Sequence, residues 1–537
     1  MHAHGLSAGP GPSLMNGKPD RMPGGFISGI QMRIMDPKPL HHVQTLTKRQ
    51  RGKFGGDLVS KALPESTMED RLSETIGSDI NGKRSGPLDV LVAGGGPSGL
   101  ALAAAMSGSG MRVGLVDPAL MSDFSNNYGV WVDEFEAIGF EDCLSCVWPS
   151  AKVIFDDEDC DRHLNRAYGQ VDKKKLKGKL MERCMENGVE FRQGQVKSVE
   201  NCGRFSTAVC NDDMRIDAFL VVDATGFARR LLEFNSPDKK LDSAKVAPGY
   251  QVTYGILAEV ESHPYNSSEE MVLMDWRSSH LSRDQYRGNE LEPSFLYVMP
   301  FSDTLIFLEE TSLVDRPAVR SEDLKERLQQ RMASLNIKVV NVLEEERAMI
   351  PMGGALPVIP QPVLGVGGSA GMVHPSTGYM IARAVEVAPD IAKIIKPLIQ
   401  RAKAGWLEEE SFAESCWAAA WPTDERRQWD FMNLGMQILC ELDPKGLRDF
   451  FKAFFALEEW LWGGYLSWRL SGIQCVVMGL SLLSVAPNQF RVRLIWTSLP
   501  FLPEFISAWV ASLFVLRPSS EQSLKLQAQW QKKMSRT

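Results

Sequence analysis

Apolar positions are spaced in several different ways along this chain of 537 residues, and each spacing predicts a different kind of element. Short apolar runs lead into glycine-rich turns and then into helical segments near residues 90 and 364. Between about 245 and 345, strand-length apolar or alternating segments are separated by turn residues, which predicts an antiparallel sheet. Beyond 400 the spacing is helical and rich in Trp and Phe. The pattern predicts an α/β fold, of the α+β kind, with a hydrophobic helical C-terminal region.

The segment 88–118 contains a strand, a glycine-rich turn, an alanine-rich helix and a second strand. Within it, Gly94, Gly96 and Gly99 satisfy G-x-G-x-x-G. The first permits a tight turn, the second lets the backbone approach a pyrophosphate, and the third lets the helix pack closely on the strand. Asp117 lies 23 residues after Gly94, where an acid should meet a ribose hydroxyl. The segment predicts a Rossmann-like dinucleotide site made by Gly94, Gly95, Gly96, Pro97, Ser98, Gly99 and Asp117.

Two later segments extend the predicted cofactor site. The apolar strand 217–223 and the residues after it resemble the A-T-G strand of many two-dinucleotide-fold flavoproteins, with expected contacts from Ala224, Thr225 and Gly226. The segment 362–389 is again strand, glycine turn and helix, and its expected contacts are Gly367, Gly368, Ser369, Ala370, Gly371 and Met372. Such flavoproteins carry a Gly-Asp pair where this chain has two glycines, so the contact to the ribityl chain must differ. Because the three segments are spread over 89–390, we favour FAD over NAD.

The stretch LIFLEETSLV, residues 305–314, places two adjacent carboxylates in an apolar strand. On a strand, Glu309 and Glu310 point to opposite faces, so one of them is expected to lie against apolar neighbours. A buried carboxylate is costly unless it is paired, hydrogen-bonded or protonated. The pair is therefore a candidate catalytic site, and periodicity alone does not decide which acid is buried.

Charge and composition narrow the range of partners. The formal net charge is -8, and no strongly basic block occurs in the part expected to fold, so nucleic acid is not an expected partner. The nine cysteines are scattered without a disulfide-like framework. Cys143 and Cys146 form a C-x-x-C, but no second pair or nearby histidine accompanies it, so we expect no metal site.

The first 87 residues differ in composition from the rest. Up to residue 60 there are eight Lys and Arg against three acids, with frequent Gly, Pro, Ser and Thr and no secretory apolar core. A basic leader that is poor in acids is typical of an organellar transit segment, and an ordinary disordered N-terminus is the alternative. We expect a disordered leader and a polar linker over 1–87.

The hydrophobic tail suggests contact with a membrane. The apolar run 473–486 is short for a spanning helix, and the longer run 494–516 is interrupted by Pro500, Pro503 and Glu504. Aromatic residues near basic ones suit a helix lying in a membrane interface, and the basic residues concerned are Arg469, Arg491 and Arg493. We favour peripheral or monotopic membrane contact over a buried helical cap or a spanning helix.

Six stretches follow one another in an order typical of one family: NNYGVWVDEFE (126–136), GYQVTYGILAEVE (249–261), MDWRSSHL (274–281), FLEETSLV (307–314), IPMGGALPVIPQ (350–361) and AGMVHPSTGYM (370–380). Together they resemble the plant-type lycopene cyclases, most closely the β-cyclases, from about residue 88 to the mid-400s and more loosely through the tail. The stretches VVDATGF and MVHPSTGYM fit the β pattern better than that of the ε-cyclases. Capsanthin and neoxanthin synthases share nearly all of these motifs.

The resemblance implies a flavoprotein that closes the ψ-ends of lycopene into β-ionone rings, through γ-carotene to β-carotene. It implies an isomerase with no net redox change that nevertheless requires reduced FAD, with NADPH as the electron source. The expected substrates are lycopene and monocyclic carotenes, and the expected location is the plastid, at a membrane surface. Other carotenoid-pathway enzymes are candidate partners.

The resemblance also orders the candidate catalytic residues. By its match to the F-L-E-E-T motif, Glu309 is the expected essential acid, acting as proton donor or holding the flavin and cation in place. Glu310 is the second candidate, with a solvated outward position as its alternative. Asp275 is a candidate for polar support near the pocket, and a turn or a salt bridge with Arg277 is its alternative. His374 is a candidate for contact with the flavin or the departing proton, and a structural histidine is the alternative.

The expected domains follow from these segments. After the leader come a first flavin-binding part (88–244), an antiparallel-sheet substrate domain (245–348), a last flavin-binding part (349–395) and a helical, membrane-associating region (396–537). Two other functions remain open, an FAD-dependent carotenoid or aromatic hydroxylase and a non-catalytic carotenoid-binding membrane protein. The absent Gly-Asp pair and the adjacent glutamates speak against the hydroxylase.

Overall fold

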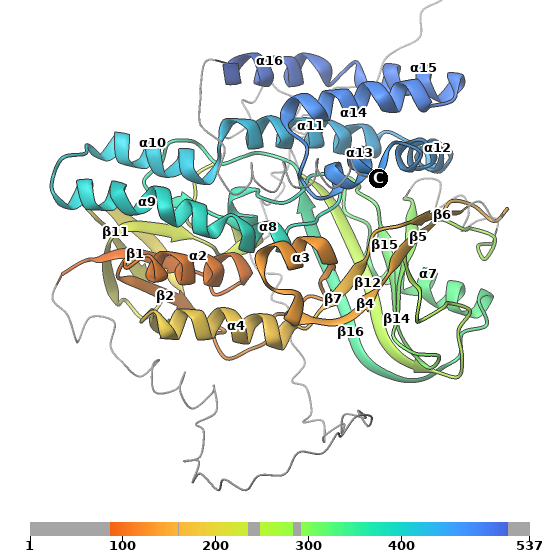
Figure 1. Cartoon of the computed structure of the whole chain (residues 1–537), viewed down its shortest axis with the longest axis horizontal. Coiled ribbons are helices and arrows are strands. Elements are labelled where there is room, and N and C mark those ends of the chain that lie inside the picture. Colours follow the sequence, from red (N-terminus) through yellow and green to blue (C-terminus); the bar gives the residue numbers. More distant parts are fainter. Residues whose placement is uncertain (1–85, 159–160, 235–247, 283–291, 514–537) are drawn as a thin grey trace, which may run out of the picture. The chain divides into compact units, whose positions relative to one another are not determined.

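The computed structural model describes residues 86–158, 161–234, 248–282 and 292–513. These residues all belong to one compact unit of the chain. They form three sheets and a large helical region, shown in Figure 1. The predicted leader lies outside the described residues, apart from its last two.

A largely parallel sheet carries the glycine-rich turn. Its strand order is β8-β2-β1-β11-β10-β9, with β17 paired to β11, and β9 and β10 make the antiparallel edge. All six residues of β1 are buried, as expected for a central parallel strand. The strands are β1 (Leu88–Ala93), β2 (Val113–Asp117), β8 (Glu190–Gln193), β9 (Val196–Asn201), β10 (Ser206–Cys210), β11 (Arg215–Asp223) and β17 (Leu364–Gly365). The predicted Rossmann-like arrangement is confirmed.

A second sheet of seven strands has the order β16-β12-β15-β14-β13-β5-β6. Its pairs are antiparallel except for β13 with β5, which run parallel. One face packs against helix α7 around an apolar core. The elements are β5 (Ser150–Ile154), β6 (Asp161–Leu164), β12 (Gly249–Val260), β13 (Glu270–Asp275), β14 (Ser294–Pro300), β15 (Leu305–Ser312), α7 (Ser321–Ser334) and β16 (Val339–Met352). The predicted antiparallel strands are confirmed, whereas the contribution of β5 and β6 and the helix α7 were not predicted.

A small antiparallel sheet and several helices complete the part of the fold that precedes the C-terminal helices. The small sheet has the order β3-β7-β4. Helix α4 begins at an N-cap, where Asp172 accepts a hydrogen bond from the backbone of Lys175 at 3.0 Å. The elements are α2 (Pro97–Gly108), β3 (Gly129–Trp131), α3 (Val132–Ile138), η1 (Glu141–Cys143), β4 (Leu144–Trp148), β7 (Tyr168–Val171), α4 (Lys173–Glu186), η2 (Gly226–Ala228) and η3 (Gly367–Ala370).

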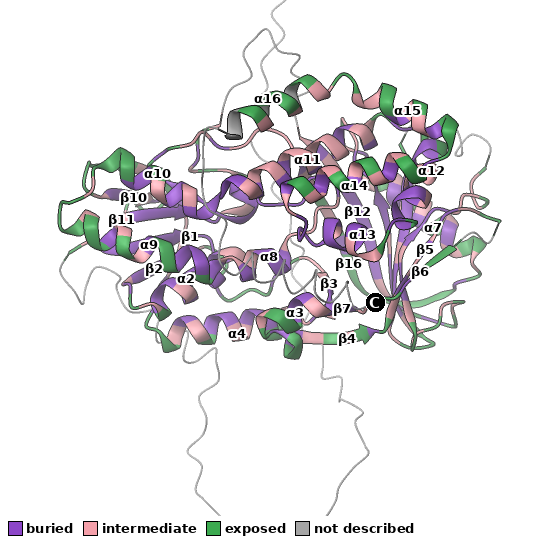
Figure 2. Cartoon of the chain, turned by 45° about the horizontal axis from the view of Figure 1, so that its top comes forward, coloured by how far each residue is buried: buried purple, intermediate pink, exposed green. Residues whose placement is uncertain are grey.

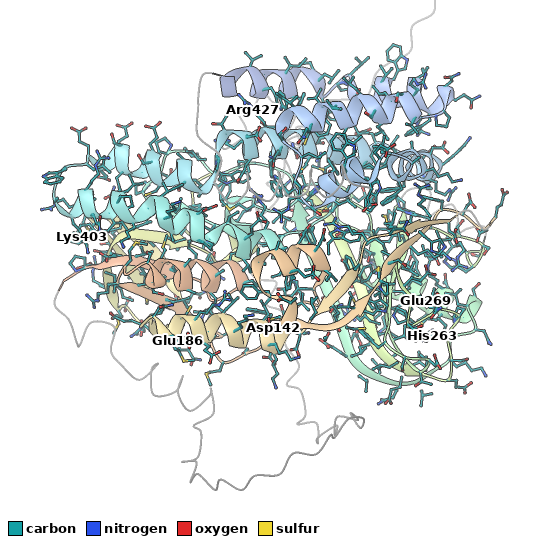
Figure 3. All side chains as sticks on the ribbon, viewed as in Figure 1. Asp142, Glu186, His263, Glu269, Lys403 and Arg427 are labelled. Atoms are coloured by element: carbon teal, nitrogen blue, oxygen red, sulfur yellow. The ribbon has the colours of Figure 1, made fainter. Side chains whose placement is uncertain are left out.

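The C-terminal part of the described chain, from 381 to 513, is helical, as predicted. Its helices are α8 (Ile381–Glu386), α9 (Ala388–Lys403), α10 (Glu409–Ala420), α11 (Thr423–Cys440), α12 (Pro444–Phe455), α13 (Glu459–Leu466), α14 (Gly472–Val485), α15 (Asn488–Ser498) and α16 (Leu502–Leu513). Figure 1 shows α14, α15 and α16 above α11 and α13, on the side away from the strands. Figure 3 places Lys403, at the end of α9, beside the parallel sheet, where it pairs with Asp89.

The outer C-terminal helices expose apolar side chains. Helix α14 buries Cys475, Met478 and Leu482, yet it also exposes Ile473 (74%) and Leu480 (62%). Figure 2 shows exposed positions along α14, α15 and α16. Within the described ranges, no helix combines the length and hydropathy needed to cross a bilayer.

One of the basic residues expected at a membrane interface lies elsewhere. Arg469 is 5% exposed, and its guanidinium donates to both carboxylate oxygens of Glu386 at 2.6 Å. Arg491 donates to backbone carbonyls at the end of α14, and Arg493 pairs with Asp443 at 2.8 Å. The expectation for Arg469 is therefore wrong, because a buried carboxylate holds its charge inside the protein.

Candidate active site

A cavity of about 210 Å³ lies between the second sheet, the small sheet and the helices α12 and α13. Eight aromatic residues line it, namely Trp131, Tyr168, Phe295, Tyr297, Tyr379, Phe451, Phe454 and Phe455. Among the described residues that line it, Glu309 supplies the only carboxylate. Figure 3 shows side chains between the strands and the helices above them, and the cavity is lined by β14 and β15 on one side and by α12 on another. An acid among aromatic rings suits chemistry on an apolar, electron-rich molecule.

Glu309 lies on the cavity face of β15. Its partners in direct register are Tyr297 on β14 and Gly255 on β12. Thr311 donates its hydroxyl to Glu309 Oε1 at 2.9 Å. Burial, with a smaller contribution from the charge of Glu346, raises the pKa of Glu309 to about 8. The carboxyl therefore keeps its proton at neutral pH.

Glu310 points to the other face of the sheet and is fully buried. The Arg331 guanidinium, on α7, donates Nε to Glu310 Oε2 at 2.8 Å and Nη2 to Oε1 at 3.0 Å. Ser294 donates its hydroxyl to Glu310 Oε1 at 2.7 Å. The expected solvated position of Glu310 is wrong, because α7 covers this face and supplies a countercharge. Its catalytic role stays a prediction, and its contacts are those of a structural ion pair.

Asp275 and His374 are both buried, but neither lines the cavity. Asp275 accepts from the backbone and guanidinium of Arg277, with Nε at 3.0 and 3.1 Å from its two oxygens. His374 shares a hydrogen bond between Nε2 and the backbone oxygen of Tyr465 at 3.0 Å, and burial lowers its pKa to about 4. These contacts match the structural alternatives for both residues.

Glu346 on β16 is the residue of this site that the sequence analysis did not single out. It is 8% exposed, and its Oε1 accepts a hydrogen bond from the backbone of Asn127 at 3.0 Å. Burial raises the pKa of Glu346 to about 6. It stands last in the acid run 344–346, which reads as a solvated stretch in the sequence. The signal that could have found it is the alternation of faces along the strand.

A buried hydrogen-bonded network holds part of the cavity wall. Tyr379 donates its hydroxyl to Glu134 Oε2 at 2.7 Å, and Arg166 donates to Glu134 Oε1 at 3.2 Å. Arg166 also donates to Asp133 at 2.9 Å and to Ser467 Oγ at 2.7 Å. Burial raises the pKa of Glu134, and the charges of Arg469 and Arg166 oppose that shift. The network fixes the Tyr379 ring at the cavity.

The glycine-rich turn between β1 and α2 has the form that a pyrophosphate requires. Gly94 has φ +116, and a Cβ there would overlap the backbone oxygen of Ala224. A Cβ at Gly99 would overlap the backbone oxygen of Gly94, whereas no atom lies within 4 Å of a Cβ at Gly96. Tight packing at two positions and open space at the third fit a phosphate group at the N-terminus of α2.

The other predicted residues of the turn lie beside it. Pro97 is the first residue of α2, and Ser98 follows it. The backbone of Gly95 donates to Asp117 Oδ2 at 2.7 Å, and the backbone of Ala119 donates to Oδ1 at 2.6 Å. The carboxylate of Asp117 thus stands at the end of β2, next to the turn. Its contact with a ribose stays a prediction.

The two later segments meet this turn. Thr225 donates its backbone and hydroxyl groups to Asp223 at 2.8 and 2.7 Å, and Gly226 has φ +69 with open space around it. A Cβ at Gly367 would overlap the Ser98 hydroxyl, so the third segment lies directly against the first. The structure therefore brings together the residues expected to bind a cofactor, which come from three parts of the sequence.

The loop that follows β17 is held from both sides. Ser369 donates its hydroxyl to the backbone oxygen of Asp223 at 2.6 Å. The indoles of Trp421 and Trp429 donate at 3.2 and 3.1 Å to the carbonyls of the loop residues Ala370 and Gly371. Gly368 lies against the Phe227 ring, and Met372 Sδ accepts from the backbone of Gly367 at 3.4 Å. The C-terminal helices thus position the loop that is expected to face the flavin.

The chain matches the family described as lycopene cyclase protein over residues 89–492. The chain belongs to this family. It is 46% identical over 473 residues to a chloroplastic lycopene beta cyclase of Arabidopsis thaliana, across 86% of this chain and 92% of that one. It is 47% identical to the chloroplastic lycopene beta cyclase of Nicotiana tabacum, across 76% of this chain and 79% of that one. It is also 44% identical to a chromoplastic capsanthin/capsorubin synthase of Citrus sinensis, again across 76% and 79%.

Two solved structures share the fold of this lycopene cyclase family member. A geranylgeranyl bacteriochlorophyll reductase-like protein from Thermoplasma acidophilum superposes with a TM-score of 0.52 at 14% identity, over 68% of this chain and 91% of its own. The halogenase PltM, in complex with ethyl mercury and mercury, gives a TM-score of 0.50 at 11% identity, over 84% and 97%. At these identities the likeness concerns the fold alone, and it agrees with the predicted combination of a Rossmann-like sheet and a second sheet.

Proposed function

We propose that this chain is a lycopene β-cyclase, an FAD-binding enzyme that closes the linear ends of lycopene into β-ionone rings. The observation that supports this most directly is the position of Glu309. This acid keeps its proton at neutral pH, and it stands in a cavity with eight aromatic side chains in its wall. Family membership and the similarity to named β-cyclases point to the same activity.

Ring closure requires a strong proton donor that is shielded from water. A proton is added to C2, the C5–C6 double bond attacks C1, and C6 then loses a proton, so atoms and charge balance without a redox change. A polyene is a weak base, and the donor must therefore be protonated, placed against the alkene and shielded from water. Glu309 meets the first requirement, and the apolar wall meets the last. The faces of Phe295, Tyr297 and Phe454 offer negative potential to a developing cation.

We infer that FAD binds at the turn after β1, with the loop 367–372 facing the flavin. Reduced flavin would supply negative charge near the cation, and NADPH is the proposed source of its electrons. Because the product has the composition of the substrate, the enzyme is proposed to be an isomerase. The chain's own contribution there is the open backbone at Gly96 and the loop held by Trp421 and Trp429.

We further propose that the enzyme works at a plastid membrane surface, with α14, α15 and α16 toward the lipid. Exposed apolar side chains gather on these helices, at Ile473, Val477, Leu480, Val492, Ile495, Trp496, Ile506 and Val510. Apolar surface on this scale marks an interaction site, and the substrate is a hydrocarbon that dissolves in lipid. Helix α12 contacts α14 and α15, and it lines the cavity with three Phe rings. The chloroplastic relatives favour the plastid.

The activity is tested by expressing the chain in a bacterium that accumulates lycopene. β-Carotene is the expected product, and γ-carotene alone would limit the enzyme to one ring. ε-Ring products, a ring of another type or unchanged lycopene would contradict the proposal. The similarity to a capsanthin/capsorubin synthase makes a different ring type the alternative that this experiment must separate.

A second experiment separates cyclisation from oxidation. Purified protein with chemically reduced FAD and lycopene in liposomes should form β-carotene without oxygen. An absolute requirement for oxygen, with NADPH consumed in step with product, would favour the hydroxylase alternative. Flavin absorbance of the purified protein, and its loss in a Gly96→Val variant, would test the cofactor site separately.

A further inference from the structure

Glu309 and Glu346 lie on either side of one glycine. Gly255, on the strand β12, is in direct register with Glu309 on β15 and with Glu346 on β16. Residues directly opposite each other in a sheet project from the same face. The two carboxylates therefore stand on the cavity face, separated by a strand that has no side chain at that position.

The glycine is required by this arrangement. A Cβ at position 255 would lie 2.8 Å from Cζ of Phe307 and 3.2 Å from both Cβ and Cγ of Glu309. Any larger residue would force Glu309 or Phe307 to move. The absence of a side chain at position 255 leaves the space between the two carboxylates open, and the charge of Glu346 raises the pKa of Glu309.

The carboxylate of Glu346 is only half satisfied. Its Oε1 accepts the backbone N–H of Asn127, whereas its Oε2 is buried and has no hydrogen-bond partner among the described residues. Buried carboxylate oxygens are normally paired, so an unpaired one indicates a role other than stability. Glu346 does not line the cavity, and so it acts through a residue that does.

Few cations face the pair. On the Glu346 side, the charge of Glu346 contributes to the raised pKa of Tyr128, which precedes β3. Lys173 on α4 lowers the pKa of Glu346, and Glu344 raises it. Lys173 is itself bound to Glu344 at 2.8 Å. On the Glu309 side, the charge of Glu309 acts on the phenols Tyr168 and Tyr297. Both of these phenols have raised pKa values and are neutral near pH 7, so the charge of Glu346 is the main charge that Glu309 meets.

We propose that Glu346 is a positioning residue for the cyclisation: its carboxylate, held across Gly255 from Glu309, keeps the proton on Glu309. The inference rests on the proposed function. A negative charge on Glu346 opposes ionisation of Glu309, because two like charges in a dry site repel each other. The proton that Glu309 gives to the alkene is matched by the proton that the ring carbon later loses, so Glu346 needs to exchange none.

The test is the pH dependence of cyclisation in the Glu346→Gln variant. Removal of the charge lets Glu309 lose its proton at lower pH, so the alkaline limb of kcat should move down by about one pH unit. Glu346→Asp retains the charge and should restore most of the wild-type limb. Glu345→Gln is the matched control: it removes a charge from the neighbouring position, on the other face of β16, where Glu345 pairs with Lys325 and Arg347.

The outcomes are distinct. A limb that stays in place in Glu346→Gln, or an Asp variant shifted as far as the Gln variant, overturns the inference while the proposed function stands. Wild-type protein that forms no cyclised carotene at any pH overturns both. If Glu346→Gln folds poorly, Glu346→Asp is compared with wild type instead. Its shorter side chain should move the alkaline limb of kcat to lower pH, by less than the shift expected for Glu346→Gln.

Discussion

Glu309 and Glu310 are neighbours on one strand, and the two faces of the sheet treat their carboxylates in opposite ways. On the α7 face, Glu310 receives two charge-assisted hydrogen bonds from Arg331 and one from Ser294. On the cavity face, Glu309 accepts the hydroxyl of Thr311, and the charge that acts on it most is that of another acid, Glu346. The α7 face therefore supplies Glu310 with a countercharge and hydrogen-bond donors, whereas the cavity face leaves Glu309 without a countercharge.

The comparison shows that burial alone does not mark a catalytic acid. Glu310 is fully buried, whereas Glu309 borders a cavity and is only partly covered by protein atoms. What differs is the partner, because an arginine stabilises the ionised form and an apolar wall with a second acid disfavours it. Reactivity follows from the missing countercharge at Glu309.

The largest effect is expected from Glu309→Gln, which removes the proposed acid with little change in shape. The loss of a positioned general acid should lower kcat by roughly 10²–10⁴-fold. The measurement is carotene formation by purified enzyme with reduced FAD, alongside flavin absorbance and thermal unfolding. Full activity in this variant would show that the cavity face of β15 is not where protonation occurs.

Glu310→Gln should affect stability instead of chemistry. It leaves the Arg331 guanidinium buried without its countercharge, which costs about 3–5 kcal/mol of unfolding free energy. The folded fraction should keep a kcat close to wild type, measured at low temperature. The double change Glu310→Leu with Arg331→Met should recover much of the stability, because it removes both charges. A large loss of kcat at native stability would place Glu310 in the chemistry after all.

Much of this fold can be predicted because its glycine turn and its strands are specified by residues close together in the sequence. The turn at Gly94, Gly96 and Gly99 is set by backbone geometry within a few residues, and the strands of the second sheet follow from alternation. The opposite directions of Glu309 and Glu310 follow from the same alternation. The resemblance to a family then ranked the two acids, which periodicity could not do.

The remainder depends on contacts between distant segments. Arg331 lies on a helix, α7, that the sequence pattern did not reveal, and it reverses the expected exposure of Glu310. Glu346 is buried, and it accepts a hydrogen bond from the backbone of Asn127, 219 residues earlier in the chain. Its pairing with Gly255 is a matter of strand register, which an isolated run of acids does not specify. Alternation along β16 separates the face of Glu346 from that of Glu345, but only the assembled sheet shows what each face meets.

A smaller effect, on the pH dependence of the unfolding free energy, also distinguishes the cavity face from the α7 face. The pKa of Glu309 is raised from 4.5 to about 8 in the folded protein. Between these values the folded state binds this proton more tightly than the unfolded chain, so its contribution to stability is lost as the pH rises and is constant above about 8.

Glu309→Gln should remove that loss. Relative to wild type, the variant should gain on the order of 1–3 kcal/mol of unfolding free energy between about pH 5 and pH 8.5. Denaturant unfolding at several pH values measures it, and Glu345→Gln is the control on the opposite face of the sheet. An equal pH slope in wild type and Glu309→Gln would show that Glu309 is ionised in the folded protein.

The smallest effect is expected at the aromatic wall, where neighbouring residues of β14 again divide between the faces. Phe295 lines the cavity, and Leu296 lies in the core against α7. Phe295→Leu removes one ring from the cation's surroundings, which is worth about 0.5–2 kcal/mol and predicts a fall in kcat of about 2- to 30-fold. Leu296→Met conserves volume on the other face, so it should cost less than about 1.5 kcal/mol of stability and leave kcat unchanged. Only a side chain on the cavity face can stabilise the cation. Similar kcat values for the two variants would therefore mean that the Phe295 ring serves packing alone.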